Sequence, residues 1–203
     1  MHLCKICTRA IIKDMSELST RDLKRQSTAA QIHQVAERMA LEQGLAQVKV
    51  EDIATAATIS RRTFFNYFPT KEDAILGLTQ PVLTDEALQV FESSTESLLV
   101  RTAGLMVAVK RTTYVAQDSS VKERKVLRER YPELRARFDA YIMAAEQLIR
   151  PVVERNTGSD DAEIVMRLAS AILRYTYTID PEMYENSVKR SVDTFLQTIN
   201  RIS

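Results

Sequence analysis

Turn-forming residues are scarce along this chain, and their scarcity restricts what it can fold into. Its 203 residues include only 4 Gly and 5 Pro, while Ala, Leu, Glu, Arg and Gln are abundant. The abundant residues favour helices, and so few Gly and Pro leave little room for hairpin turns between strands. The apolar fraction of 45% with 27% charged residues is typical of a globular protein. We therefore predict an all-α fold.

The distribution of apolar and charged residues narrows the possible partners. No stretch approaches the roughly 20 apolar residues that a membrane span needs, and charged residues interrupt the N-terminal segment where a signal peptide would be apolar. We therefore expect a cytoplasmic protein with no membrane partner. The net charge of +1 neither requires nor excludes a nucleic-acid partner. The positions of the charged residues along the chain must therefore decide whether it binds nucleic acid.

Cap residues mark two helices in the N-terminal third. Thr28 and Gln31 have the spacing of a capping box, which predicts that the first helix begins there. Gly44 stands where a left-handed residue would end that helix. A second helix is expected over 50–58, because its apolar residues share one face and its first turn is acidic.

The next two helices are also marked by their ends. Ser60 is a suitable N-cap for a short helix that begins at Arg61, and Pro69 should stop it. Thr70 should cap a fourth helix that runs on until Pro81 kinks or ends it. Longer helices are then expected at 84–92, 95–116, 119–130, 132–156, 160–178 and 183–201.

Two short helices joined by a tight turn form a helix-turn-helix arrangement, and spacing sorts the aromatic residues of the second one. Phe64 and Phe68 lie one turn apart and should pack in the core. Guanidinium groups on the opposite face can form forked hydrogen bonds with guanine in a major groove, and an apolar ring suits a thymine methyl. The expected base contacts are Arg61, Arg62, Thr63 and Phe65, and the expected phosphate contacts are Lys49, Ser60, Tyr67 and Lys71. On spacing alone, the alternative is that the two arginines only form a solvent-exposed helix face and contact no DNA.

Residues 28–78 resemble the DNA-binding domain of the TetR (tetracycline-repressor-like) family over their whole length and without a gap. The chain departs from the family pattern at Thr58, where Gly is usual, at Lys49, where Ser or Thr is usual, and at Phe65, where many members have Tyr. The residues that carry the resemblance are Thr28, Ile32, Ala36, Ala40, Gly44, Val50, Ile53, Ala54, Ala57, Ser60, Thr63, Phe64, Phe65, Tyr67, Phe68, Lys71 and Glu72.

The resemblance implies a homodimeric transcription regulator that binds double-stranded operator DNA. Such a regulator is usually a repressor, released from a palindromic operator when a small-molecule effector, here an apolar or acyl ligand, enters the C-terminal domain. The expected organisation is a flexible tail at 1–22, the three-helix DNA-binding domain at 23–78, and a larger helical ligand-binding and dimerisation domain at 79–203.

In the C-terminal half the resemblance implies only architecture, with the last two helices pairing in the dimer and a ligand pocket among the middle helices. Each residue assigned to either role could instead belong to the core of its own chain. The expected dimer interface is Ile164, Leu168, Ile172, Tyr175, Val188, Val192, Phe195 and Ile199. The expected pocket is Phe91, Leu98, Met106, Tyr114, Phe138, Tyr141 and Met143.

The densest charge lies in 122–137, which holds seven basic and three acidic residues. This segment could attract an anionic ligand head group such as a coenzyme A thioester, add to the field facing DNA, or form a solvated helix face with Glu–Arg pairs.

Cys4 and Cys7 form a C-x-x-C pattern near the N-terminus, which could serve a thiol- or metal-responsive regulator or belong to a frayed tail. With only two histidines, the sequence shows no recognisable set of catalytic residues, so we expect no enzymatic activity, no cofactor and no metal site. A third possible class of function is a helical adaptor protein that does not bind DNA. The presence of Arg61, Arg62, Tyr67 and Lys71 together argues against it.

Overall fold

The computed structural model describes residues 20–115, 121–179 and 185–202. All elements in these ranges are α-helices apart from one isolated bridge between Leu78 and Tyr114, which confirms the all-α prediction. None of the described helices is long and apolar enough to cross a bilayer. The helices are α2 (Thr20–Gln43), α3 (Val50–Ala56), α4 (Arg61–Tyr67), α5 (Lys71–Leu76), α6 (Asp85–Ser93), α7 (Leu98–Thr112), α8 (Val121–Arg130), α9 (Pro132–Thr157), α10 (Ser159–Ile179) and α11 (Glu185–Ile202).

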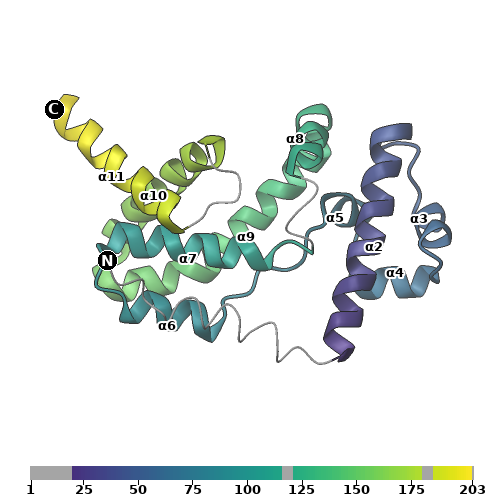
Figure 1. The fold of residues 1–203 in the computed structure, drawn as a ribbon, viewed down its shortest axis with the longest axis horizontal. Helices are drawn as coiled ribbons and strands as arrows, with labels where there is room; N and C mark the ends of the chain where they lie inside the picture. Colours follow the sequence, from purple (N-terminus) through teal and green to yellow (C-terminus); the bar gives the residue numbers. More distant parts are fainter. Residues whose placement is uncertain (1–19, 116–120, 180–184, 203) are drawn as a thin grey trace. The chain divides into compact units, whose positions relative to one another are not determined.

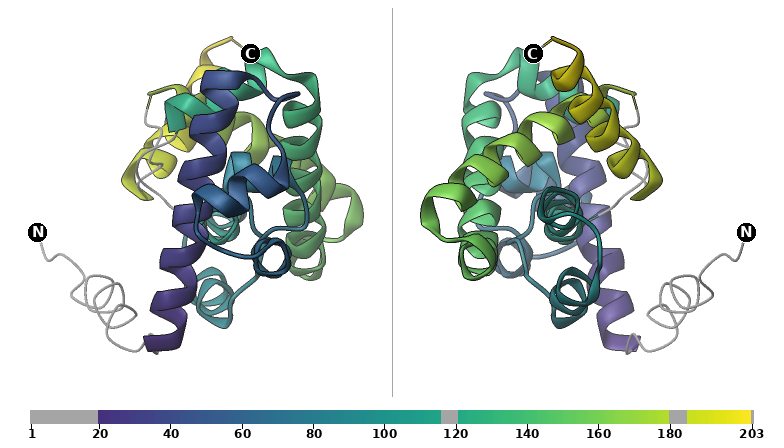
Figure 2. Two further views of the ribbon diagram at one scale, coloured as in Figure 1. Left: turned by 90° about the vertical axis from the view of Figure 1, so that its right-hand side faces the viewer. Right: turned by 90° about the vertical axis from the view of Figure 1, so that its left-hand side faces the viewer.

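The chain divides into two compact units between Gly77 and Leu78. In the first unit the long helix α2 packs against α3 and α5, and α3 packs against α4. Figures 1 and 2 show the short helices grouped beside α2. Burial of apolar side chains from all these helices stabilises the unit. Its core residues include Ile32, Val35, Ala36, Ala40, Ile53, Ala54, Phe64, Phe68, Ala74, Ile75 and Leu76.

Helix α2 begins earlier than the capping-box pattern predicts. It extends from Thr20, and Thr28 lies inside it, where its hydroxyl donates to the carbonyl of Lys24 at 2.9 Å. A threonine hydroxyl bonded to the carbonyl four residues back is compatible with a helix interior. The prediction of a helix start at Thr28 was therefore wrong, because a capping-box pattern does not end a helix that continues on its N-terminal side.

Helix α5 ends earlier than predicted, at Leu76 instead of near Pro81. Gly77 adopts a left-handed conformation with φ of 63° and closes the helix. The ring of His33 lies 3.0 Å from the position that a Cβ at Gly77 would occupy. His33 Nδ1 lies 2.9 Å from the carbonyl oxygen of Ala74, to which it donates. The close packing of α2 against the end of α5 therefore requires glycine at this position.

The second unit is built around α7, which packs against α6, α9, α10 and α11. In Figure 1, α7 lies between α6 on one side and α10 and α11 on the other. The ends of the helices differ from the predicted ranges by a few residues, and the largest difference is at α7, which Ser97 caps by accepting from the amide of Val100. The core contains Phe91, Ala103, Leu105, Met106, Val107, Val109, Ala145, Ile149, Val152, Val153, Ala162, Met166, Ala169 and Val188.

The segment after Leu78 is fixed against the end of α7. The amide of Thr79 donates to the carbonyl of Thr113 at 2.8 Å, and the Thr79 hydroxyl donates to the carbonyl of Thr112 at 2.9 Å. Beside these bonds, Leu78 forms its bridge with Tyr114. The first residues of the second unit are thus held in place by hydrogen bonds from the main chain and side chain of Thr79 to the end of α7.

Candidate nucleic-acid interface

The turn between α3 and α4 is a Schellman motif centred on Thr58. The amide of Ile59 donates to the carbonyl of Ala54 at 2.9 Å, and that of Thr58 donates to the carbonyl of Thr55 at 3.0 Å. Thr58 has φ of 56°, and it is the one non-glycine residue with positive φ among those the structure describes. Left-handed backbone is costly for a β-branched residue. The turn keeps the hydrogen bonds of a Schellman motif without the usual glycine, and Thr58 is therefore expected to be strained.

Replacing Thr58 with glycine is expected to stabilise the protein by about 1 kcal/mol, because glycine adopts positive φ without a Cβ clash. The Thr58 side chain is exposed, so its removal should cost little stability. Urea denaturation followed by circular dichroism measures the change. Thr55→Gly is the matched control, because Thr55 is an exposed residue inside α3, and it should lose about 0.5 kcal/mol. Equal effects in the two variants would show that the turn is not strained.

Helix α4 has a buried side and an exposed side. Ser60 caps its start, since the hydroxyl oxygen accepts from the amide of Thr63 at 2.9 Å, as predicted. Phe64 and Phe68 are fully buried, with ring centroids 6.2 Å apart, which confirms their predicted place in the core. These two rings fix the rotation of α4, so its opposite face must point to solvent.

The exposed face of α4 carries Arg61, Arg62, Phe65 and Asn66. The Arg61 guanidinium lies 5.0 Å from the centroid of the Phe65 ring. Phe65 keeps 43% of its surface exposed although it also makes an edge contact with Phe64. Asn66 was not among the predicted contacts, although its place between Phe65 and Tyr67 could have indicated it. An exposed asparagine can read adenine through two hydrogen bonds.

Arg61 is also paired within the protein. Its Nε lies 2.8 Å from Oε1 of Glu51, and both side chains are well exposed, at 64% and 60%. An ion pair this exposed contributes about 0–1 kcal/mol, so a DNA group can replace Glu51 at little cost. The pair aligns Arg61 along the face of α4, whereas Arg62 extends from the same helical turn into solvent.

The predicted phosphate contacts differ in their surroundings. Lys49 is exposed at the start of α3, where its side chain makes no capping hydrogen bond. The Ser60 hydroxyl serves the cap and lies 2.8 Å from the hydroxyl of Thr63. Tyr67 is half-buried at the end of α4. Lys71 donates from Nζ to the carbonyls of Leu45 and Val48 at 3.0 and 2.9 Å.

The two carbonyl bonds give Lys71 a role in holding the loop between α2 and α3. Lys71→Met is expected to lower the free energy of unfolding by about 1.5–3 kcal/mol, because two partly buried carbonyls lose a charged donor. Lys49→Met, on an exposed lysine nearby, should change it by less than about 0.5 kcal/mol. Urea denaturation of both variants measures this difference. Equal stabilities would mean that the Lys71 bonds do not hold the loop.

The structure places the predicted pocket residues in several environments within the second unit. Phe91 and Met106 lie in the apolar core, and Leu98 packs against it. Tyr114, Phe138 and Tyr141 each have an arginine over the ring. Met143 is exposed. Ordinary packing thus accounts for the first group, and the rings with arginines form a separate environment.

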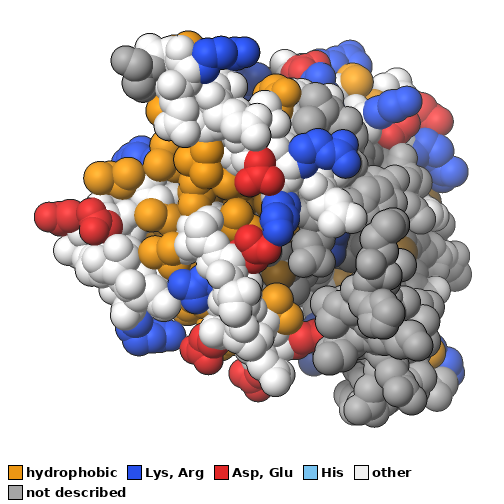
Figure 3. Space-filling view, turned by 60° about the vertical axis from the view of Figure 1, so that its left-hand side comes forward, with side chains coloured by type: hydrophobic (Ala, Val, Ile, Leu, Met, Phe, Trp, Pro, Cys, Tyr) orange, Lys and Arg blue, Asp and Glu red, His pale blue; other side chains and the backbone are white. Residues whose placement is uncertain are grey.

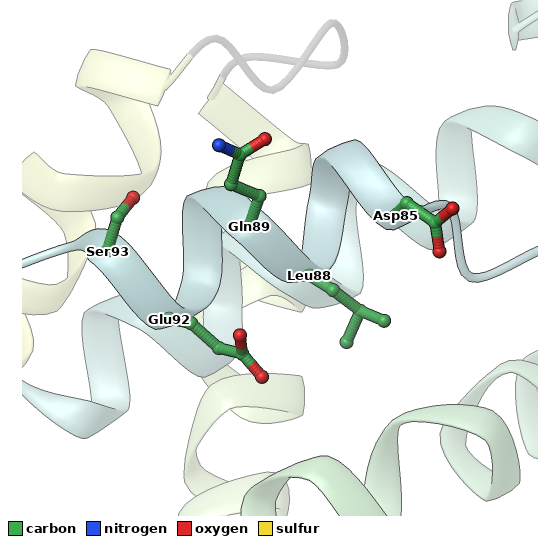
Figure 4. Close-up of a pocket in the computed structure, with 5 residues that line it drawn as sticks. All are labelled: Asp85, Leu88, Gln89, Glu92 and Ser93. Carbon is green, nitrogen blue, oxygen red and sulfur yellow. The ribbon is translucent and has the colours of Figure 1, made fainter.

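A hollow of about 420 Å³ lies along α6, and its lining residues differ from the predicted pocket residues, although Phe91 belongs to the same helix. Figure 4 shows that its labelled lining residues all come from this one helix, with Leu88 as the one apolar side chain among them. A site with walls from a single helix encloses little of a ligand's surface. The lining residues are Asp85, Leu88, Gln89, Glu92 and Ser93.

The residues expected at the dimer interface on α10 and α11 differ in their exposure, because some are buried in their own chain and others face solvent. Ile172, Val188 and Val192 are buried within their own chain, so a partner chain cannot reach them directly. Figure 3 views the side of the second unit on which α10 and α11 lie and shows apolar side chains grouped among charged ones. Leu168 and Phe195 are half-buried. The exposed apolar residues of α10 and α11 are Ile164, Ala171, Tyr175, Leu196, Ile199 and Ile202.

Cys4 and Cys7 lie outside the described residues. Within the described residues, no group of three or more His, Cys, Asp or Glu side chains is placed to hold a metal ion.

Comparison with known proteins relates the first unit to a family. Residues 32–76 match the family model described as bacterial regulatory proteins, tetR family. The chain is also 38% identical over 69 residues to the HTH-type transcriptional regulator EthR of Mycolicibacterium smegmatis. That alignment covers 34% of this chain and only 31% of the relative.

Proposed function

We propose, from the match of residues 32–76 to the tetR family of bacterial regulatory proteins, that this chain is a sequence-specific DNA-binding regulator of that family and acts as a homodimer. A regulator of this kind works in the cytoplasm, where the chromosome is accessible. The proposal makes double-stranded operator DNA and a second copy of the chain its macromolecular partners. It assigns the chain no catalytic activity.

One observation carries the proposal: α4 is anchored by Phe64 and Phe68 and presents Arg61 and Arg62 on its exposed face. A guanidinium can form two hydrogen bonds with O6 and N7 of guanine, and the ring of Phe65 can contact a thymine methyl. A helix fixed by buried rings holds these groups in one register, which sequence-specific recognition requires. We assign base contacts to Arg61, Arg62, Thr63 and Phe65, and we add Asn66.

Phosphate contacts fix the position of such a helix on the duplex without reading its sequence. Lys49 is exposed at the start of α3, and Lys71 is the first residue of α5. An ammonium group has three donors, so Lys71 can bond two carbonyls and still reach a phosphate. The contribution of these two lysines to DNA affinity should fall steeply as the salt concentration rises.

A dimer through α10 and α11 is supported by their exposed apolar side chains. Ile164 and Tyr175 on α10 and Ile199 on α11 remain accessible in the single chain. A second copy related by a two-fold axis would cover the same residues on both chains. Two recognition helices would then meet one face of the duplex, about 34 Å apart.

We further propose that the regulator is a repressor and that a small apolar or acyl ligand in the second unit releases it from a palindromic operator. Selection of bound duplexes from a random pool tests the core of this proposal. The selected sequences should contain an inverted repeat, with half-sites separated by about 10 base pairs or a multiple of that distance. A pool that yields no enriched sequence, or only a single unpaired half-site, would contradict it.

A further inference from the structure

Glu51 places an acidic side chain beside the groups that we assign to DNA bases. Its Oε1 lies 2.8 Å from Nε of Arg61, and the two side chains are well exposed, at 60% and 64%. Glu51 belongs to the first turn of α3 and Arg61 is the first residue of α4, so the pair spans the turn between the two helices. Because phosphates repel a carboxylate, this position is unfavourable in a DNA complex unless the carboxylate meets a hydrogen-bond donor there.

Ordinary structural roles do not account for the position of Glu51. An acidic residue in the first turn of a helix interacts favourably with the helix dipole, and Asp52 in the same turn does so equally. An ion pair this exposed contributes little to the stability of a fold. Neither role requires a carboxylate next to an arginine on the exposed face of α4.

DNA binding changes the partner of Arg61. In the free chain its guanidinium is held between the carboxylate of Glu51 and the ring of Phe65, whose centroid is 5.0 Å away. When α4 enters a major groove, O6 and N7 of guanine replace the carboxylate as acceptors. Glu51 then lies at the bases without its arginine.

The released carboxylate stays within reach of the bases. In the free chain it is one hydrogen bond, 2.8 Å, from Arg61, and successive base pairs of B-DNA are about 3.4 Å apart. A carboxylate at this distance from an arginine that contacts guanine therefore lies level with the neighbouring base pair.

The major groove offers a carboxylate only two kinds of donor, the N4 amino group of cytosine and the N6 amino group of adenine. Guanine and thymine present the acceptors O6, N7 and O4 instead, which repel a carboxylate. Adenine also presents its N7 acceptor beside N6, whereas cytosine presents its amino group without a neighbouring acceptor. Cytosine is therefore the base that suits Glu51 best.

We propose that Glu51 is a specificity-determining residue that accepts a hydrogen bond from N4 of a cytosine in the base pair next to the guanine contacted by Arg61. The proposal rests on the proposed function, because it requires α4 to lie in a major groove. It adds a base contact from α3 to those of α4. It also makes Glu51 reject sequences, because thymine at the same position would place O4 against the carboxylate.

Selection of bound duplexes from a random pool, carried out with wild-type protein and with variants, tests this role. Wild-type half-sites should contain a cytosine in the base pair next to a guanine. Glu51→Ala should keep the guanine and accept any base at the neighbouring position, whereas Arg61→Ala should lose the preference for the guanine. Glu51→Gln should shift the neighbouring position to adenine, because an amide can bond both N6 and N7.

Fluorescence anisotropy with the selected operator measures the size of the effect. Changing the cytosine to thymine should weaken wild-type binding by roughly 5- to 100-fold per half-site, and should weaken binding of Glu51→Ala by less than about 2-fold. Asp52→Ala is the matched control, because it removes an exposed carboxylate from the same helical turn. This control should discriminate between cytosine and thymine as strongly as wild type does.

Three outcomes would overturn the role of Glu51 and leave the proposed function standing. Wild type and Glu51→Ala could select the same inverted repeat, or Asp52→Ala could relax the cytosine as much as Glu51→Ala does. Glu51→Ala could also lose only the guanine, which would make Glu51 a positioning residue for Arg61. A wild-type pool without any enriched sequence would overturn the proposed function together with this proposal. Circular dichroism checks that the variants stay helical, and Glu51→Gln carries the test if the alanine variant does not.

Discussion

Arg62→Ala reduces the affinity for the selected operator by roughly 10- to 100-fold in our expectation, which corresponds to about 1–3 kcal/mol for a lost bidentate contact with guanine. Arg62 is exposed on α4 and belongs to the face opposite Phe64 and Phe68. Fluorescence anisotropy with the operator and with a duplex of scrambled sequence measures both affinities. The loss should be confined to the operator, because non-specific binding depends on phosphate contacts.

Arg38→Ala is the matched control, because Arg38 is an exposed arginine of the same unit on α2 and its removal changes the charge equally. It should weaken both duplexes to a similar and smaller extent. If Arg62→Ala weakens both duplexes equally, Arg62 contacts phosphate and does not read a base. Arg61→Ala should lose less than Arg62→Ala, since its pairing with Glu51 must be broken for DNA to bind.

Ile199→Glu is expected to convert the dimer to a monomer at micromolar concentration. Ile199 is an exposed apolar residue of α11, and in the proposed interface each copy of the chain would bury its own introduced carboxylate. Leaving an unpaired charge in an interface costs several kcal/mol, about 3–5 for a comparable broken pair. Sedimentation velocity measures the change, and operator affinity should fall with it.

Val90→Glu controls for the added charge, because Val90 is an exposed apolar residue on α6, outside α10 and α11. It should leave the protein dimeric. A wild-type protein that sediments as a monomer, or an Ile199→Glu variant that remains a dimer, would place the interface elsewhere. Circular dichroism of both variants separates loss of dimer from loss of fold.

The division of α4 into two faces could be predicted from the sequence because it depends only on local spacing. Phe64 and Phe68 are one turn apart, and the cap at Ser60 and the break at Pro69 define the helix that carries them. Burial of the two rings then fixes the opposite face. The same reasoning located the helices of the second unit to within a few residues, since their caps are also local.

The end of α5 was predicted too late, although a local signal marks it. Gly77 is a left-handed C-cap of the kind expected at Gly44, and the apolar pattern that continues past it was given more weight. The contact that requires glycine here could not be predicted, because the His33 ring that occupies the space of a Cβ at Gly77 belongs to α2.

Partners of charged side chains were also beyond local reasoning. Arg61 pairs with Glu51 across the turn, and Lys71 bonds carbonyls in a loop more than twenty residues earlier. Lys110 of α7 and Arg124 and Arg128 of α8 lie over the rings of Tyr177, Tyr114 and Phe138, which come from α10, the segment after α7, and α9. The sequence showed the charge of α8, and only the packing of α7 to α10 separates its buried side from its solvated side.

The most direct test of the account is methylation interference on the selected operator, because methylation at N7 of guanine blocks hydrogen bonding in the major groove. Wild-type protein should be displaced by methylation of guanines in both half-sites, and Arg62→Ala should become insensitive at one guanine in each. Interference that is identical for the two proteins, or confined to adenines methylated in the minor groove, would show that α4 does not read DNA bases.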